Sequence, residues 1–185
     1  MIELRDLLPQ DEESLFVWRG EPDVARWMSD ADVAGRDAHR AWFNQLRSDA
    51  DMRGWLIQSN GRPSGLLTLT GLTGHHRRSA WNWFIGDREA RGRGVGRAAQ
   101  VLGLDQAFGA LGLHKVWAEV MADNDAAMKV QTGAGFRREG YLRGHVLKDG
   151  QPRDVVMLGI LAEEWAVLAP AARRNLTDAG LIAGS

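Results

Sequence analysis

The stretch RGRGVGR at residues 91–97 is the part of this sequence that decides its fold. Its three glycines allow a tight turn and let a ligand approach the main-chain N–H groups. An alternating aromatic segment precedes it at residues 80–86, and a segment of helical periodicity follows it. The turn therefore lies between a strand and a helix. The unpaired N–H groups and the dipole at a helix N-terminus favour an anion there.

Three arginines, Arg91, Arg93 and Arg97, bring positive charge to the same turn. The turn and its arginines together predict a cradle for a pyrophosphate group. It is not a Walker loop, because no Gly-Lys-Ser/Thr follows, and it is not the dinucleotide fingerprint, because Arg97 stands where a third glycine or alanine is required. On this segment alone, a tight turn with solvated arginines is the alternative interpretation.

Outward from this turn, periodicity and turn signals predict one strand, three helices, three strands, a helix, a strand, a helix and two strands. The expected strands are residues 1–8, 54–59, 63–73, 80–86, 114–121, 136–147 and 153–161, and the expected helices are 11–19, 23–28, 37–47, 97–111 and 124–132. A polar link is expected up to Gly35. Asn60-Gly61 and Asp149-Gly150 are typical of two-residue hairpin turns.

This order predicts an α/β fold, with a mixed sheet and helices on both of its faces. We expect a single domain over residues 1–168, which ends in a short helical segment. The Ala/Arg/Gly-rich residues 169–185 are expected to form a weakly structured tail.

Composition excludes several kinds of function. Of 185 residues, 44% are apolar and 25% are charged, which is typical of a globular domain. A net charge of −1 gives no basic excess for binding nucleic acid. The absence of cysteine excludes disulfides, zinc–thiolate sites and cysteine nucleophiles. His75 and His76 have no third ligand at metal-binding spacing, so no metal is expected.

The N-terminal residues MIELRDLLPQDEE lack the basic start and apolar run of a signal peptide. No stretch approaches the roughly 20 apolar residues of a membrane span. We therefore expect a cytoplasmic protein without membrane contact.

Two motifs in order carry a resemblance to a known family. The first is Arg-x-x-Gly-x-Gly at residues 91–96, directly after the aromatic strand. The second is Asn124-Asp125-x-x-Met128, whose helix ends at Gly135-Phe136. Together they resemble the GNAT superfamily of acetyl-CoA-dependent N-acetyltransferases, over roughly residues 2–165. The resemblance implies a mostly antiparallel sheet with a splayed central strand pair, and acetyl-CoA as cofactor with coenzyme A as product.

The resemblance also implies roles for individual residues. Asn124 opens a helix beside the pantetheine arm, although an ordinary helix N-cap also explains this asparagine. A backbone N–H around Phe84-Ile85 polarises the thioester carbonyl. The coenzyme A pyrophosphate is bound by Arg91, Gly92, Arg93, Gly94, Val95, Gly96 and Arg97.

The expected chemistry is direct transfer from the thioester to an amine in a ternary complex, and the lack of cysteine excludes an acetyl-cysteine intermediate. Glu119 is the candidate base, with an ion-paired or solvated strand residue as the alternative. Many relatives carry a tyrosine acid where Gln131 stands, and glutamine has no comparably acidic proton. Either the thiolate leaves with help from solvent or a nearby group, or Gln131 orients a water. Tyr141, the lone phenol, is expected to pack on its strand.

Two branches of the superfamily resemble this chain and differ in the acceptor. The residues from Phe136 to Arg143, Lys148-Asp149-Gly150, Asp154 and Glu164-Trp165 resemble the ribosomal-protein N-terminal acetyltransferases, although both branches share this C-terminal pattern. The N-terminal third resembles the UDP-4-amino-sugar N-acetyltransferases of pseudaminic-acid synthesis, which implies a role in flagellin glycosylation. The residues of this second pattern are Trp18-Arg19-x-x-Pro22-Asp23, Met28 and His39-x-x-Trp42-Phe43.

The second pattern is the one expected to vary with the acceptor, so it predicts a UDP-linked amino sugar as substrate. Arg19 suits a phosphate, His39 a hydroxyl or phosphate, and Met28 and Trp42 offer apolar surface. The alternatives are a protein or peptide N-terminus, and a non-catalytic acyl-CoA-binding domain. A homodimer is a candidate assembly.

Overall fold

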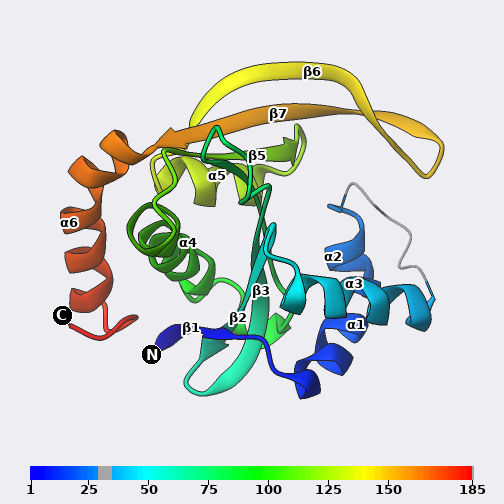
Figure 1. The fold of residues 1–185 in the computed structure, drawn as a ribbon, viewed down its shortest axis with the longest axis horizontal. Helices are drawn as coiled ribbons and strands as arrows, with labels where there is room; N and C mark the ends of the chain where they lie inside the picture. Colours follow the sequence, from blue (N-terminus) through cyan, green and yellow to red (C-terminus); the bar gives the residue numbers. More distant parts are fainter. Residues whose placement is uncertain (29–34, 185) are drawn as a thin grey trace.

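The computed structural model describes residues 1–28 and 35–184, and its strands form one sheet in the order β1-β2-β3-β4-β5-β7-β6 (Figure 1). The strands are β1 (Ile2–Asp6), β2 (Met52–Ser59), β3 (Arg62–Thr70), β4 (Arg78–Ile85), β5 (Lys115–Met121), β6 (Arg137–Lys148) and β7 (Gln151–Leu161). The helices are η1 (Pro9–Asp11), α1 (Glu12–Gly20), α2 (Pro22–Ala25), α3 (Arg36–Ser48), η2 (Arg88–Ala90), α4 (Val95–Asp105), the π-turn η3 (Gln106–Ala110), α5 (Asp125–Gly133) and α6 (Ala162–Asp178).

The predicted order of strands and helices and the α/β class are confirmed. The polar link expected after Met28 lies outside the described residues. Both predicted hairpin turns are present, with positive φ at each central residue: 51° and 76° at Asn60 and Gly61, and 51° and 72° at Asp149 and Gly150. This is the type I′ geometry that matches the twist of antiparallel strands.

The sheet is antiparallel except for one pair of central strands. The parallel pair β4 and β5 is in register only from Arg78 opposite Lys115 to Ala80 opposite Trp117. Beyond these residues the two strands diverge, which confirms the splayed central pair. The second half of β4 therefore presents an edge that β5 does not cover.

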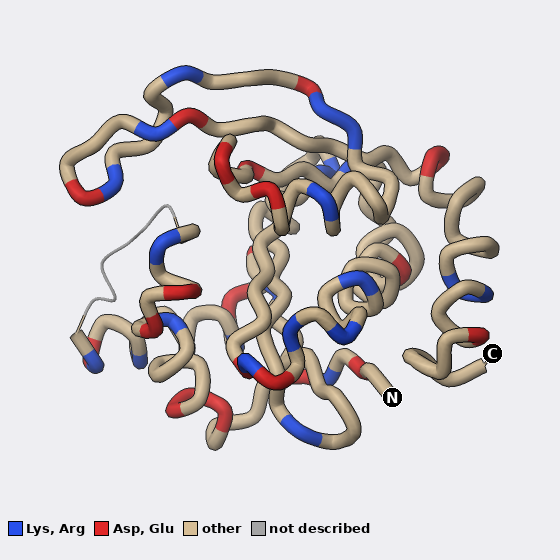
Figure 2. Tube along the Cα trace, turned by 180° about the vertical axis from the view of Figure 1, so that it is seen from behind, with Lys and Arg blue, Asp and Glu red and all other residues tan. Residues whose placement is uncertain are grey.

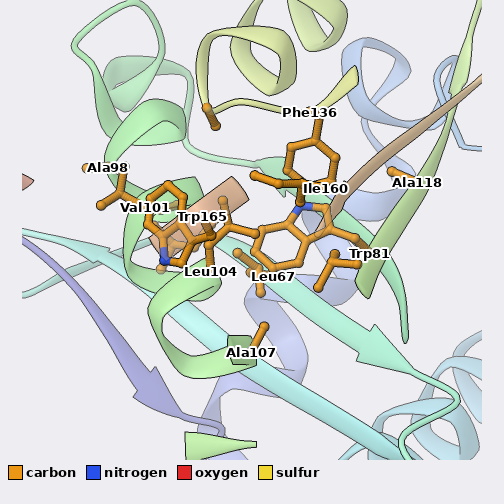
Figure 3. Close-up of a cluster of buried hydrophobic side chains, with 14 of the residues drawn as sticks. Leu67, Trp81, Ala98, Val101, Leu104, Ala107, Ala118, Phe136, Ile160 and Trp165 are labelled. Atoms are coloured by element: carbon orange, nitrogen blue, oxygen red, sulfur yellow. The ribbon is translucent and has the colours of Figure 1, made fainter. Parts of the chain in front are cut away.

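Each face of the sheet has its own apolar core. Helices α1 and α3 cover one face, where the fully buried Leu15 and Phe43 pack with residues of β2 and β3. Helices α4 and α6 lie on the other face (Figures 1 and 3). There Trp81 of β4 packs with Leu67, Leu104 and Trp165 among others. Strand β4 alternates between the two cores as predicted, because Trp83 and Ile85 join the second core and Phe84 joins the first.

The C-terminal part of the chain corrects the expectation of a weakly structured tail. Helix α6 continues to Asp178 despite Pro170 in its interior, and Leu176 and Ile182 are buried. The N–H of Ile2 donates a hydrogen bond to the carbonyl of Leu181 at 2.6 Å, which ties this segment to β1. Sequence periodicity was weak here because alanine, a strong helix former with little apolar surface, fills much of the helix.

Among the described residues, charged side chains of both signs are spread over the molecule (Figure 2). No helix in the described part of the chain is both long and apolar enough to cross a bilayer.

Candidate active site

A cleft of about 890 Å³ opens where β4 and β5 part. One end is bounded by the start of α4 and by α5, and the other by α2, Trp42 of α3 and Val146 of β6. Tryptophans line much of the wall, namely Trp27, Trp42, Trp81, Trp83 and Trp117. The divergence of the two strands therefore creates one continuous space between the glycine-rich turn and the N-terminal helices.

The glycine-rich turn forms the first end of this cleft. Gly92 and Gly94 have φ of 75° and 81°, a region that side-chain-bearing residues rarely adopt. Gly94 is the N-cap of α4, and its carbonyl accepts the first helical hydrogen bond, from the N–H of Ala98 at 2.9 Å. The preceding N–H groups, those of residues 95–97, have no carbonyl partner within the helix and lie at its positive end. This geometry suits an anion.

The side chain of Arg91 is hydrogen-bonded to the main chain that leads into the turn. Its Nε donates to the carbonyl of Ile85 at 3.0 Å, a terminal nitrogen donates to the carbonyl of Gly86 at 3.2 Å, and the guanidinium lies 3.4 Å from the carboxylate of Asp23. The arginine thus fixes the turn to the end of β4 and to α2. Arg91 also lines the cleft, so its expected contact with a phosphate stays a prediction beside this positioning role.

The other residues of this turn differ in whether they line the cleft. Gly92, Gly96 and Arg97 line the cleft. Val95 is 2% exposed and its side chain belongs to the core, so only its main chain faces a ligand. Arg93 is exposed and does not line the cleft. The main chain of the turn therefore carries most of the predicted phosphate contacts.

Asn124 is a helix N-cap as predicted, and its expected place beside a pantetheine arm stays a prediction. Its side-chain oxygen accepts a hydrogen bond from the N–H of Ala127 at 3.1 Å, which caps α5. The residue also lines the cleft, opposite the end of β4. Phe84 and Ile85 line the same space, on the part of β4 that has no pairing with β5. Main-chain N–H groups on that edge are placed to donate to a ligand.

Glu119 and Gln131 both face the cleft. A carboxylate oxygen of Glu119 lies 3.7 Å from Nε2 of His145, on the neighbouring β6–β7 hairpin. Gln131 is only 1% exposed, and its side-chain oxygen has no hydrogen-bond partner among the described residues. The cleft thus holds one carboxylate and one buried amide at the positions that the sequence singled out.

Tyr141 lies outside the cleft. Its ring is 56% exposed and its hydroxyl donates to Asp154 at 2.6 Å, a hydrogen bond that raises the pKa of the phenol. The expected partly buried packing is wrong, because β6 is an edge strand that overhangs the sheet. Asp154 also accepts from the N–H of Gly144 at 2.7 Å, so this pair of bonds holds the bulge of β6.

The four residues expected to bind the acceptor are not equivalent. Arg19, Met28 and Trp42 line the cleft, and the Arg19 guanidinium lies 4.0 Å above the Trp42 ring. His39 is 1% exposed and does not line the cleft. Its Nδ1 is 3.3 Å from an Arg19 nitrogen, and its Nε2 is 3.2 Å from the carbonyl of Glu12. An imidazole protonated on Nε2 satisfies both bonds.

Direct contact between His39 and a substrate is therefore corrected to a positioning role. Burial lowers the pKa of His39, and the positive charge of Arg19 lowers it further, whereas the hydrogen bond to Glu12 raises it. The neutral ring holds Arg19 against Trp42. Sequence alone did not show this, because a histidine on a helix does not reveal which helix packs over it.

Lys148 is a site residue that the sequence did not identify. It is 5% exposed, and its ammonium donates to the carbonyls of Ala25 at 2.7 Å and Met28 at 3.1 Å. The lysine therefore joins the β6–β7 hairpin to the end of α2, at the wall of the cleft. In the sequence Lys148 belongs to the C-terminal pattern Lys148-Asp149-Gly150, but that pattern does not report its contact with the end of α2.

Comparison with known proteins agrees with this geometry. Residues 2–137 match the acetyltransferase (GNAT) domain family, and this chain belongs to that family. Acetyltransferases of the GNAT type use acetyl-CoA. Spermidine N(1)-acetyltransferase of Escherichia coli K12 is 27% identical over 117 residues, which cover 63% of this chain and 62% of that protein. The match therefore spans about three fifths of that relative's length.

Two solved structures cover more of the chain. Mycobacterium smegmatis RimJ in complex with CoA-disulfide is 29% identical, with a TM-score of 0.81 over 97% of this chain and 89% of that one. Spermidine N-acetyltransferase from Vibrio cholerae, in complex with CoA and spermine, has a TM-score of 0.83 at 23% identity, over 89% of this chain and 98% of that one. The second likeness shows the fold alone.

Proposed function

We propose that this chain is an acetyl-CoA-dependent N-acetyltransferase that transfers the acetyl group directly to a single primary amine. One observation carries the proposal: a continuous cleft joins the N-terminus of α4, the free edge of β4 and the carboxylate of Glu119. These are an anion site, hydrogen-bond donors for a developing oxyanion and a proton acceptor.

The donor would lie along the first end of the cleft. Its pyrophosphate fits the main-chain N–H groups of residues 95–97, with Arg97 adding charge. Its thioester carbonyl would accept from the edge of β4 near Phe84 and Ile85. Glu119 would take the proton that the attacking amine loses, and His145 beside it would help hold the carboxylate in place. No covalent enzyme intermediate is needed.

The acceptor end favours one amine over a polyamine. Its described carboxylates are Asp23 and Glu119, and Asp23 already bridges Arg88 and Arg91 at 3.4 Å. A polycation would need several uncommitted anions. The tryptophan walls instead fit an acceptor with a flat or apolar body. The relatives named above for spermidine make a polyamine the alternative that any assay has to include.

Within this class, the UDP-linked 4-amino sugar is the acceptor that the cleft chemistry favours. Arg19 and Arg26 bring two cations to the same end of the cleft as Trp27 and Trp42. A diphosphate and a uracil ring need such cations and such rings. A peptide N-terminus is the second candidate, and the C-terminal sequence pattern, which both branches share, does not decide between the two.

Thiol release from acetyl-CoA, measured against a panel of amines, tests the proposal. The panel contains UDP-4-amino sugars, other amino sugars, N-terminal peptides, spermidine and spermine. We expect turnover on a monoamine and background rates with the polyamines. Turnover with spermidine alone would contradict the acceptor class. Tight acetyl-CoA binding in calorimetry with no turnover on any amine would favour a non-catalytic acyl-CoA-binding domain.

Replacement of Glu119 tests the base. Glu119→Gln removes the proton acceptor but keeps the size of the side chain, so kcat should fall by about 100-fold. The affinity for acetyl-CoA should stay the same. Glu163→Gln, an exposed change on α6, is the matched control and should leave both quantities unaltered. An unchanged kcat in Glu119→Gln would assign the base to another group.

A further inference from the structure

Four buried polar atoms have no hydrogen-bond partner in the described part of the chain. They are the indole nitrogen of Trp81, both amide atoms of Gln100 and the side-chain oxygen of Gln131. The three side chains are 2%, 0% and 1% exposed. More than about nine tenths of buried polar groups in proteins are hydrogen-bonded, so three neighbouring exceptions need a partner that the chain itself does not supply.

The packing of α4 shows where these side chains meet. A Cβ added to Gly96 would lie 3.0 Å from the Trp83 ring and 3.8 Å from Val130, and one added to Gly103 would lie 2.6 Å from the Trp81 ring. Gln100 is four residues after the first glycine and three before the second, so it lies on the same face of the helix. It therefore faces β4 between the two tryptophans.

Gln131 comes from the third element at this place. It follows Val130, which packs near Gly96, and the main-chain carbonyl of Gln131 accepts from the N–H of Phe136 at 3.1 Å. The Phe136 ring packs on Trp81, with ring centroids 6.0 Å apart (Figure 3). Trp81 and Gln131 also line the cleft. The four atoms without hydrogen-bond partners among the described residues therefore lie between β4, α4 and α5, at the closed side of the cleft.

We propose that Trp81, Gln100 and Gln131 enclose ordered water, and that this water gives a proton to the sulfur that leaves during acetyl transfer. The donors and acceptors are complementary, since an indole N–H donates and each amide both donates and accepts. A buried water needs two to four such partners. The catalytic part of this inference rests on the proposed function, whereas the water site does not.

Glu119 starts as the base for the amine, Asp23 is ion-paired with arginine, and no other ordinary general acid lines the described part of the cleft. Its described lining has no histidine, lysine, tyrosine or cysteine. Tyr141 lies outside it and is bonded to Asp154. The reaction forms a C–N bond and breaks the C–S bond, and the sulfur keeps the electron pair and needs one proton. The water supplies that proton and regains one from solvent in the open cleft, while the proton of the amine leaves through Glu119.

A crystal structure of the coenzyme A complex at atomic resolution tests the water site without any assay. We expect water density within hydrogen-bond distance of the Gln131 side-chain oxygen and the Trp81 indole nitrogen. A dry pocket, or an amide that bonds directly to a protein group, would overturn the inference.

Kinetics of two matched pairs of variants test the role of the water. Gln131→Met should lower kcat by about tenfold or more, with an unchanged KM for acetyl-CoA, because it removes the acceptor but keeps the length of the side chain. Gln45→Met, on α3 and outside the cleft, should change neither. Trp81→Phe should lower kcat in the same way. Trp165→Phe, which removes an indole N–H bonded to Asp105 at 2.9 Å, should lower only the Tm.

The outcomes separate this inference from the proposed function. If the wild-type protein acetylates an amine and Gln131→Met is equally fast, the proton route is wrong and the function stands. If the wild-type protein acetylates no amine, the function is wrong, and the electron density still decides whether the three side chains hold water.

Discussion

His39 has the most specific environment of any single residue at this site. Its two ring nitrogens connect Arg19 to the main chain of Glu12, and its ring packs against Phe16 and Trp42 at centroid distances of 5.2 and 5.3 Å. This arrangement holds only while the ring is neutral, because a protonated Nδ1 could not accept from Arg19. The acceptor end of the cleft therefore depends on one buried, uncharged imidazole.

The lowered pKa of His39 predicts a pH dependence of stability. Burial is its main cause, so the unfolded chain takes up a proton near pH 6.5 that the folded protein resists. The free energy of unfolding should fall as the pH drops below about 6.5, until the folded protein also binds the proton. His39→Gln should remove this part of the dependence, because an amide keeps a donor and an acceptor without titrating. Urea unfolding between pH 5 and pH 8 measures it.

An identical slope in His39→Gln and the wild type would show that the folded and unfolded chains bind the proton of His39 equally, against the geometry described here.

At the scale of elements, the N-terminus of α4 combines two constraints at Gly94. A Cβ there would need a strained φ of 81° and would lie 2.8 Å from a methyl group of Leu181. Gly94→Ala should therefore lower both the Tm and the affinity for acetyl-CoA, the strain alone costing about 1–2 kcal/mol. Differential scanning calorimetry and titration calorimetry measure the two effects.

Arg97 offers the cleaner test of the anion site. Arg97→Gln removes a charge from an exposed side chain at the cleft and leaves the glycine backbone intact. The affinity for acetyl-CoA should fall, its salt dependence should weaken, and the Tm should stay within about 1 °C of the wild type. An affinity equal to that of the wild type at low salt would place the pyrophosphate elsewhere.

The β6–β7 hairpin is the second element that shapes the cleft. Lys148→Met would remove the ammonium that donates to the carbonyls of Ala25 and Met28, of which the Ala25 carbonyl keeps only the N–H of Met28, so the Tm should fall by several degrees. The KM of the acceptor should rise because Met28 lines the cleft, while the affinity for acetyl-CoA should not change. Lys129→Met, at an exposed position on α5, is the control. Equal acceptor KM values in the two variants would show that this tether has no influence on the cleft.

The sequence predicted those features of the site that depend on local backbone geometry, and missed those that depend on contacts between distant segments. The tight turn at Gly92 and Gly94 was predicted correctly because a positive φ favours glycine, which is a local requirement. The hairpin turns at Asn60 and Asp149 were predicted for the same reason, because their sequence requirement is also local. The roles of His39, Arg91 and Lys148 depend on contacts between elements far apart in the chain, and no spacing rule reports those. Gln131 was identified from its place in the second motif, whereas the buried polar atoms of Trp81 and Gln100 that lack partners among the described residues could not be predicted, for the same reason.

At the scale of the whole molecule, the C-terminal segment after α6 packs against the first strand and the glycine-rich turn. It pairs with Ile2, buries Ile182 and places Leu181 against the glycine-rich turn. Deleting residues 179–185 should lower the stability by about 2 kcal/mol for the lost isoleucine alone. It should also weaken acetyl-CoA binding, because Gly94 loses its support.

The point variant Leu181→Ala separates these two effects. It should weaken acetyl-CoA binding with a smaller loss of stability than the deletion, since Ile182 and the hydrogen bond to Ile2 remain. Titration calorimetry on both proteins gives the comparison. Binding by the deleted protein at full affinity would mean that the turn keeps its shape unaided.

The contact between Leu181 and the glycine-rich turn also sets an order of events during synthesis. The seven strands of the described sheet and the glycine-rich turn are translated before Leu181, whose side chain packs against Gly94 of that turn. A nascent chain with its whole sheet outside the ribosome still lacks that support. Acetyl-CoA in the surrounding solution would then stabilise the chain more strongly after α6 and Leu181 have emerged and folded back than before.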